Sequence, residues 1–427
     1  MIDLNKGIFM EILFGYGKGK ISVEFDENRL IAVLKPYKTD IKLTGEEEIK
    51  RSLNSPIGSR PLRELVRTGQ KIAIVTSDIT RPVPGYRILP EVLNELNRGG
   101  VPDKDIIIVF ALGSHRKHTE EEKRNLVGKE VYERIKCIDS DESDCVYLGK
   151  TSYGTPVEIF RPVVEADFRI CIGNIEYHYF AGYSGGMKAI MPGVSTRAAI
   201  QANHGRMVSP GAVAGRIEGN PIREDIEEVA KFCPADFIVN VVLDENGEII
   251  HCVSGHYIQA HREGCRFIDK MYKVEISELA DIVIVSAGGY PKDINMYQAQ
   301  KALDNAQHAV REGGIIIWIA ACTEGFGEKT FEKWMTEHSQ SSDIISHIQK
   351  EFKLGAHKAA AIAKVLQKAR IMLVSDLEPE LVRSIHLEPF ADIKSAIKAA
   401  IDDINRPARI TAMPYGASTL PVLALNS

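Results

Sequence analysis

The sequence KIAIVT at residues 71–76 is a continuous run of mostly β-branched residues, and the polar sequence SDITRP follows it at residues 77–82. Three similar runs come later, DIIIVFA at 105–111, FRICIG at 168–173 and FIVNVVL at 237–243. Apolar runs that do not alternate with polar residues are typical of strands covered on both faces. We therefore expect these four segments to be strands of one buried sheet.

A second group of such runs follows a polar, helix-like stretch at about residues 256–280, namely DIVIVS at 281–286, IIIWIA at 315–320 and IMLVS at 371–375. Helical patterns, for example at 88–97 and 221–232, separate the strands within each group. This alternation predicts an α/β fold with two α/β domains, residues 1–270 and 271–427, and an active site in the cleft between them. The last strand-like segment, residues 408–413, fits either sheet.

The composition of the 427-residue chain is that of a folded protein, with 44% hydrophobic and 26% charged residues. A formal charge of -5 without long runs of one sign argues against nucleic acid as a partner. The sequence offers neither a membrane-spanning segment nor a signal-peptide core. Its seven cysteines are scattered and form no metal-binding pattern, so we expect reduced thiols and a cytoplasmic protein.

Polar side chains follow the first two predicted strands, at the ends where α/β proteins carry their sites. Arg81 is a cation that could bind a carboxylate or phosphate; alternatively, Asp78 and Thr80 only cap a helix and Arg81 lies on the surface. His115 comes directly after the second strand. His118 is expected at the surface, just before a helix that begins near Thr119.

The third predicted strand leads into the sequence NIEYHYFAGYSGGMKAIMPG at residues 174–193, which contains His178, a glycine-rich loop and Lys188. Such a loop lets backbone amides approach an anion, and Lys188 could pair with that anion or act as a nucleophilic amine. A nucleotide P-loop is excluded, because Ala189 stands where a magnesium-binding Ser or Thr is required. A further histidine, His204, follows in the sequence ANHG.

The fourth candidate stretch, GGYPKDINMYQAQK at residues 288–301, places Tyr297 and Lys301 four residues apart, hence on one helical face, with Gln298 beside them. Residue spacing by itself predicts an anion-binding α/β protein and no particular reaction.

Five motifs together are more specific: Ser-Asp-x-Thr-Arg-Pro, Gly-x-His-Arg, Glu-x-His-x-Phe-Ala-Gly-x-Ser-Gly-Gly-x-Lys, Ala-Asn-His and Gly-Gly-Tyr-Pro-x-Asp-x-Asn-x-Tyr-Gln-Ala-x-Lys. In this order, they resemble the nickel-dependent lactate racemase family over nearly the whole chain. The resemblance implies a nickel-pincer nucleotide bound covalently to a lysine and made by cofactor-biosynthesis proteins. The roles it implies are cofactor attachment for Lys188, nickel ligation for His204, acid/base catalysis for His115 and His178, cofactor binding for Asp78, Thr80, Ser184, Gly185 and Gly186, and substrate binding for Arg81, Tyr297, Gln298, Lys301 and His357.

The reaction of that family, the interconversion of D- and L-2-hydroxy acids, explains the need for two histidines. Removing a proton from carbon beside a carboxylate is difficult, whereas hydride transfer to a cofactor gives a planar 2-keto acid that can take hydride back on either face. The hydroxyl group points to a different side in each enantiomer, so an acid/base group is needed on both sides.

Two positions depart from lactate racemase: Met187 replaces an arginine, and His357 replaces a tryptophan near the substrate. We expect lactate as the substrate, with malate, a longer aliphatic 2-hydroxy acid or a sugar acid as alternatives. Two other classes stay open, a zinc hydrolase that uses His115, His178 and His204, and a carboxylate-binding protein without catalytic activity.

Overall fold

The structure, a computed structural model, describes residues 9–404 and 406–424. Its chain forms two compact units. We call residues 39–270 the first unit, and residues 9–38 together with residues 271–424 the second unit. Each unit has its own sheet, and the prediction of an α/β fold is confirmed.

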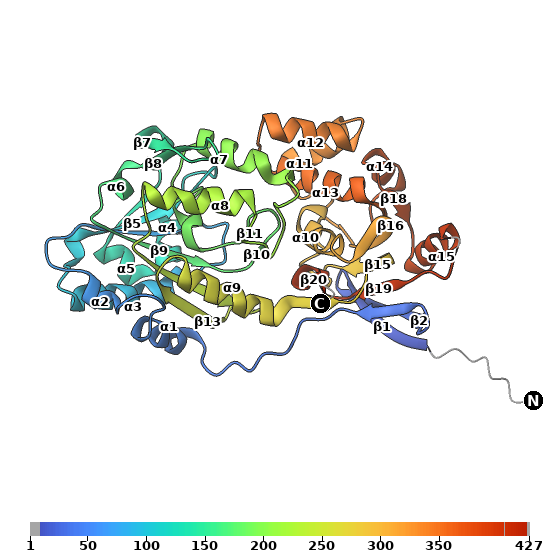
Figure 1. The fold of residues 1–427 in the computed structure, drawn as a ribbon, viewed down its shortest axis with the longest axis horizontal. Helices are drawn as coiled ribbons and strands as arrows, with labels where there is room; N and C mark the ends of the chain where they lie inside the picture. Colours follow the sequence, from blue (N-terminus) through green and yellow to red (C-terminus); the bar gives the residue numbers. More distant parts are fainter. Residues whose placement is uncertain (1–8, 405, 425–427) are drawn as a thin grey trace, which may run out of the picture. The chain divides into compact units, whose positions relative to one another are not determined.

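The first unit is built on a six-stranded sheet (Figure 1). Its spatial order is β13 (Ile249–Gly255), β12 (Phe237–Leu243), β9 (Phe168–Asn174), β4 (Ile72–Ser77), β5 (Ile106–Ala111) and β6 (Lys136–Asp139). All neighbours are parallel except β13, which is antiparallel to β12. The four strands predicted from the sequence are β4, β5, β9 and β12, and their bounds agree within one residue.

Helices and two short β-ladders surround this sheet. The helices are α1 (Gly45–Asn54), α2 (Leu62–Leu65), α3 (Gly85–Arg98), α4 (Glu120–Val127), α5 (Lys129–Arg134), α6 (Arg161–Val164), α7 (Arg197–His204), α8 (Pro221–Glu228) and α9 (Gln259–Tyr272). The ladders pair β7 (Cys145–Lys150) with β8 (Pro156–Phe160), and β10 (Tyr177–His178) with β11 (Gly182–Tyr183). A core of buried apolar side chains from α1, α3 and the strands fills the space between the helices and one face of the sheet.

The second unit contains a parallel six-stranded sheet. Its order is β18 (Glu388–Phe390), β17 (Ala369–Val374), β16 (Val310–Ile319), β15 (Ala280–Ser286), β19 (Ile410–Met413) and β3 (Leu30–Val33). The remaining strands are paired as β1 (Phe9–Tyr16) with β2 (Gly19–Asp26), and β14 (Lys273–Ile276) with β20 (Leu420–Leu423). The helices are α10 (Met296–Ala306), α11 (Lys329–Glu337), α12 (Ser341–Lys350), α13 (Ala356–Lys368), α14 (Pro379–Ser384) and α15 (Ile393–Asp403).

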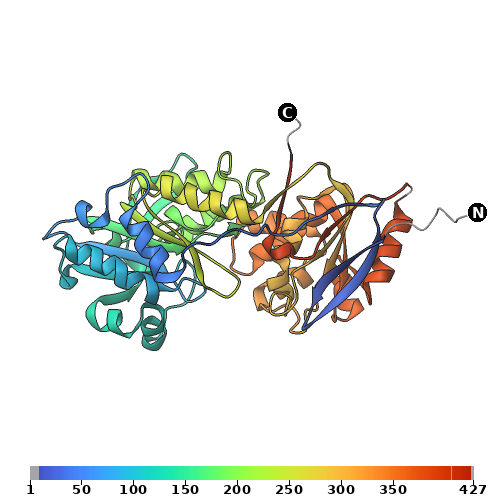
Figure 2. The same cartoon turned by 90° about the horizontal axis from the view of Figure 1, so that it is seen from below.

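The N-terminal segment belongs to the second unit, whereas the sequence analysis assigns it to the first domain. Strand β3 adds to the edge of the second sheet by pairing with β19. Ile12 and Phe14 of β1 pack into the same core as Ile282 and Ile284 of β15. Figure 2 shows the blue β1–β2 hairpin beside the orange and red elements of this unit. The segment predicted at residues 408–413 forms β19, which pairs with β15 and therefore belongs to the second sheet.

Within the described part of the chain, every helix is too short or too polar to span a lipid bilayer. All seven cysteines are free thiols.

Candidate active site

Three neighbouring strands of the first sheet end where the predicted site residues begin. β5, β4 and β9 are adjacent and parallel, so the segments that follow them emerge at the same edge. The chain order also changes direction here, with β5 on one side of β4 and β9 on the other. Open α/β sheets bind ligands at such a switch point. The three segments are residues 78–81, 112–115 and 175–188.

Asp78 and His115 form a hydrogen-bonded pair at this edge. His115 Nδ1 lies 2.5 Å from Asp78 Oδ2, and Thr80 Oγ1 donates to Oδ1 over 2.8 Å. Burial acts to raise the pKa of Asp78, but the hydrogen bonds from His115 and Thr80 outweigh it and the pKa is lowered. The ionised carboxylate only accepts hydrogen bonds, so Nδ1 of His115 carries the hydrogen. In the neutral ring, Nε2 is then the nitrogen that accepts a proton.

His118 is buried, so its predicted surface position is wrong. Its side chain has no exposed area, and its ring packs edge-on against Phe110 at 5.1 Å. Nδ1 lies 2.6 Å from Asp139 Oδ1, and Nε2 accepts a hydrogen bond from the backbone N–H of Ile79 over 3.1 Å. His118 therefore holds the turn that carries Asp78. The helix begins as predicted, since Thr119 and Glu122 form a capping box at the start of α4.

The buried ring of Phe180 lies among three of the predicted residues. Its centroid is 4.4 Å from that of His178 and 4.9 Å from that of His204, with both rings edge-on. Lys188 Nζ lies 5.8 Å from the Phe180 centroid. The fold thus gathers His178, Lys188 and His204 around one aromatic side chain.

Burial and neighbouring cations disfavour the charged forms of His178 and Lys188. The pKa of His178 lies well below its usual value because of burial, then because of the charges of Lys188 and Arg81. The pKa of Lys188 is lowered by burial, then by the charges of Arg223 and Arg81. The positive charge of Arg81, in the turn after β4, therefore lowers the pKa of both residues beside Phe180. In His178, Nδ1 accepts a hydrogen bond from Ala181 N over 3.3 Å, so Nε2 carries the hydrogen of the neutral ring.

Asn203 sets the orientation of His204 at the end of α7. Asn203 Nδ2 donates to Asp225 Oδ2 over 2.8 Å, which points Oδ1 of the same amide toward His204 Nδ1, 2.8 Å away. Nδ1 of His204 therefore carries the hydrogen, and Nε2 is the nitrogen with the lone pair. Asp225, fully buried, also accepts from Thr151 and Thr155 over 2.6 Å each. Histidines that bind metals commonly have their second nitrogen held by such an outer partner.

The described residues contain no group of three or more His, Cys, Asp or Glu side chains that could hold a metal ion. The three-histidine zinc site considered above thus finds no support in the geometry of His115, His178 and His204. A metal bound by His204 would need further ligands from outside the protein.

The glycine-rich loop is held by its own hydrogen bonds. Ser184 Oγ donates to Asn174 O over 2.8 Å and accepts from Glu176 N, and Gly186 N donates to Asn240 Oδ1 over 2.7 Å. These groups shape the loop that leads to Lys188. The cofactor-binding roles of Ser184, Gly185 and Gly186 stay predictions.

The other predicted residues lie in the second unit, on α10 and α13. Gln298 and Lys301 are exposed on α10, whereas His357 is buried at the start of α13. The rings of Tyr297 and His357 meet edge-on at 6.3 Å. Lys358, which the sequence analysis missed, donates from Nζ to Tyr297 O over 2.5 Å and lies 4.3 Å from the centroid of the Tyr297 ring. No sequence motif singles out this lysine.

The fold and the site define an α/β enzyme in which two histidines and a lysine follow neighbouring strands of one sheet, and a third histidine lies at the end of α7. Residues 16–215 match the model of the lactate racemase N-terminal domain, and residues 276–421 match that of the lactate racemase C-terminal domain. The chain belongs to the lactate racemase family and is an isomerase, a racemase.

Two characterised relatives are each 34% identical to the chain. The lactate racemase of Thermoanaerobacterium thermosaccharolyticum aligns over 95% of this chain and 97% of its own length, and that of Lactiplantibacillus plantarum over 95% and 98%. The apoprotein structure of the former superposes with a TM-score of 0.86 at 33% identity, covering 96% of this chain and all of that one. A Thermotoga maritima protein with a TM-score of 0.58 at 19% identity shares the fold.

Proposed function

We propose that the protein racemises a 2-hydroxy acid, with lactate as the first candidate, and that it uses a nickel-pincer nucleotide attached to Lys188. The observation that carries the proposal is the grouping of Lys188, His178 and His204 around Phe180. Membership of the lactate racemase family supports the substrate class.

The chemistry of the side chains fits this cofactor. An amine must be unprotonated to form a covalent bond, and burial together with Arg223 and Arg81 lowers the pKa of Lys188. Because Nδ1 of His204 carries the hydrogen, Nε2 is the nitrogen with the lone pair, and imidazole nitrogen is a good ligand for nickel. When bound, the group would supply reversible hydride acceptance at the substrate carbon. Because it must be synthesised, we also propose cofactor-biosynthesis proteins as partners and a cytoplasmic location.

His115 and His178 have complementary tautomers for proton transfer. Asp78 keeps the hydrogen of His115 on Nδ1, so that Nε2 of the neutral ring can take the hydroxyl proton of one enantiomer. His178 carries its hydrogen on Nε2 in the neutral ring. Once protonated to the imidazolium, it can give a proton to the oxygen of the keto acid as that acid is reduced, which leaves the neutral ring. The reverse reaction exchanges these two roles. His115 lines a cavity of about 230 Å³ together with Gly113 and Ser195, so a small molecule can reach its ring.

Arg81 would bind the substrate carboxylate, since a guanidinium matches a carboxylate with two hydrogen bonds. The substrate-binding roles of Tyr297, Gln298, Lys301 and His357 are part of the proposal. His357 in place of a tryptophan keeps malate, longer aliphatic acids and sugar acids as alternative substrates.

The proposal is tested with protein co-expressed with cofactor-biosynthesis proteins. Intact-protein and peptide mass spectrometry should find a stable adduct on Lys188, absent from Lys188→Ala and retained in Lys231→Ala, an exposed-lysine control. Enantiopure L-lactate, D-lactate and the alternative acids are then followed in D₂O. Racemisation should proceed without deuterium at the reacting carbon; solvent deuterium there, or an adduct mapped elsewhere, would contradict the proposal.

A further inference from the structure

Arg223 lies beneath the glycine-rich loop and is fully buried. It is on α8, and its side chain has no exposed area. Burying a guanidinium is unfavourable unless hydrogen bonds and an opposite charge offset the loss of hydration. Its position therefore calls for an explanation in terms of the groups it contacts.

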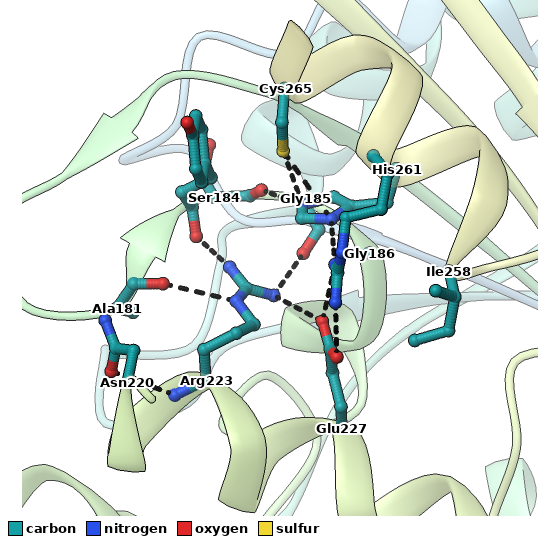
Figure 3. A network of polar contacts seen from close by, with 12 residues as sticks. Ala181, Ser184, Gly185, Gly186, Asn220, Arg223, Glu227, Ile258, His261 and Cys265 are labelled. Atoms are coloured by element: carbon teal, nitrogen blue, oxygen red, sulfur yellow. Dashed lines mark hydrogen bonds and ion pairs between the residues drawn. The ribbon is translucent and has the colours of Figure 1, made fainter. Parts of the chain in front are cut away.

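The guanidinium binds three backbone carbonyls of the loop (Figure 3). Nε donates to Ala181 O over 3.2 Å, Nη2 donates to Tyr183 O, and Nη1 reaches Gly185 O at 3.5 Å. These are alternate residues of one short segment. A planar group with five N–H donors can hold such a segment in one conformation, which the single ammonium of a lysine cannot do as well.

One of these carbonyls leads directly to Lys188. Gly185 O also accepts the backbone N–H of Lys188 over 3.3 Å. In this turn, Gly185 and Gly186 have φ values of 75° and 60°, in the left-handed region that favours glycine. The backbone of Lys188 is thus attached to a turn that Arg223 holds from below.

Arg223 also leaves a positive charge that its surroundings neutralise only in part. Its nearest carboxylate is Glu227, at 3.9 Å from Nη1. Glu227 is at the same time bound by both Nη atoms of Arg262, at 2.8 and 2.7 Å, so one carboxylate faces two guanidinium groups. The carbonyls contribute dipoles and no net charge. Such a charge acts strongly on neighbouring groups inside a protein.

The properties of Lys188 agree with this arrangement. After burial, Arg223 is the largest cause of the lowered pKa of Lys188, ahead of Arg81, while Glu176 opposes both. The charged and titratable groups that interact with Lys188 come from α8, the turn after β4, the loop and α9: Arg223, Arg81, Glu176, His178 and His261.

We propose that Arg223 is a positioning residue for Lys188: its guanidinium fixes the backbone of residues 181–185 and places a permanent positive charge behind the lysine. The consequence for cofactor attachment rests on the proposed function. The contacts between Arg223 and the loop exist in the protein without cofactor, and the experiment below uses that form.

The test measures the protonation of Lys188 by trace acetylation with acetic anhydride between pH 6 and 10. Only unprotonated amines react, and peptide mass spectrometry compares Lys188 with Lys129, whose side chain is 77% exposed. The labelling midpoint of Lys188 should lie below that of Lys129. In Arg223→Gln, it should rise by about one pH unit or more, which is about tenfold less labelling at a given pH below the midpoint. Arg223→Lys should keep the midpoint, because it keeps the charge.

Two further variants separate the charge from a general loss of structure. Glu227→Gln removes the carboxylate and should lower the midpoint, the opposite direction to Arg223→Gln. Arg266→Gln, at an exposed position on α9, should change nothing. In Arg223→Lys, hydrogen exchange of residues 181–188 should speed up, because the lysine holds fewer carbonyls.

An unchanged midpoint in folded Arg223→Gln would overturn the proposal. If circular dichroism shows that this variant does not fold, the other two decide: an unchanged or raised midpoint in Glu227→Gln, or unaltered exchange in Arg223→Lys, overturns it as well. An inactive wild-type enzyme or a missing adduct would end the proposed function and leave these labelling results intact.

Discussion

Nδ1 of His115 lies 2.5 Å from Oδ2 of Asp78, so the tautomer of a proposed catalytic base depends on a buried carboxylate. Asp78→Asn places an amide there, which can donate to His115 Nδ1 and move the ring hydrogen to Nε2. We expect racemisation of enantiopure lactate to slow by about 10²- to 10⁴-fold, the range typical of general acid–base catalysis. Asp144→Asn, an exposed carboxylate, is the control. Equal rates in the two variants would contradict the role of the pair.

Asn203 should control how firmly nickel is held. Asn203→Leu keeps the approximate volume but removes the oxygen that orients His204. Loss of such an outer partner lowers metal affinity by about 10- to 100-fold. The measurement is nickel per protein by mass spectrometry after dialysis against a chelator, with the exposed Asn246→Leu as control. Full nickel retention in Asn203→Leu would show that His204 needs no support from the amide.

Gly182 is the partner of His178 in the β10–β11 ladder and tolerates no side chain. Its φ is 76°, and an added Cβ would lie 2.0 Å from the backbone oxygen of Arg216. Gly154 has a similar φ of 80° and open space around it. Gly154→Ala should cost about 1–2 kcal/mol for the left-handed conformation alone. Gly182→Ala should cost more, and thermal unfolding of the two variants isolates the effect of the clash; equal midpoints would contradict it.

Asp304 should make the stability of the second unit depend on pH. Burial raises the pKa of Asp304 to about 7, against the opposing charges of Lys364 and Lys358. The unfolded chain loses this proton near pH 4, so the folded state binds more protons between about pH 4 and 7. The free energy of unfolding should therefore fall as the pH rises through this window, by up to about 1.4 kcal/mol per pH unit, and level off above it.

Asp304→Asn removes the titrating group and should flatten this dependence. Denaturant unfolding at pH 5, 6, 7 and 8 measures it, with Asp402→Asn at an exposed position as the control. A wild-type protein that becomes more stable between pH 5 and pH 7, relative to Asp304→Asn, would contradict the assignment.

The strands could be predicted from the sequence because each one depends on the residues of its own segment. A segment such as Phe237–Leu243 is apolar except for Asn240 because both of its faces are covered, and its bounds follow from its own residues. The motifs around His115, His178 and Lys188 come after such strands, and β5, β4 and β9 prove to be neighbours.

Sheet membership and the supporting contacts depend on residues far apart in the chain. Strand β3 joins the second sheet because β19 pairs with it, and the β1–β2 hairpin packs into the core of the same unit. No property of residues 9–33 alone indicates these partners. His118 is buried because Asp139 and Ile79 meet it from two other segments. On α8, Arg223 and Asp225 look like ordinary charged helix residues. In the folded chain, Arg223 contacts the loop before Lys188, and Asp225 contacts Asn203. Both contacts depend on the tertiary structure, because a charged group that is removed from water must be stabilised by polar partners inside the protein.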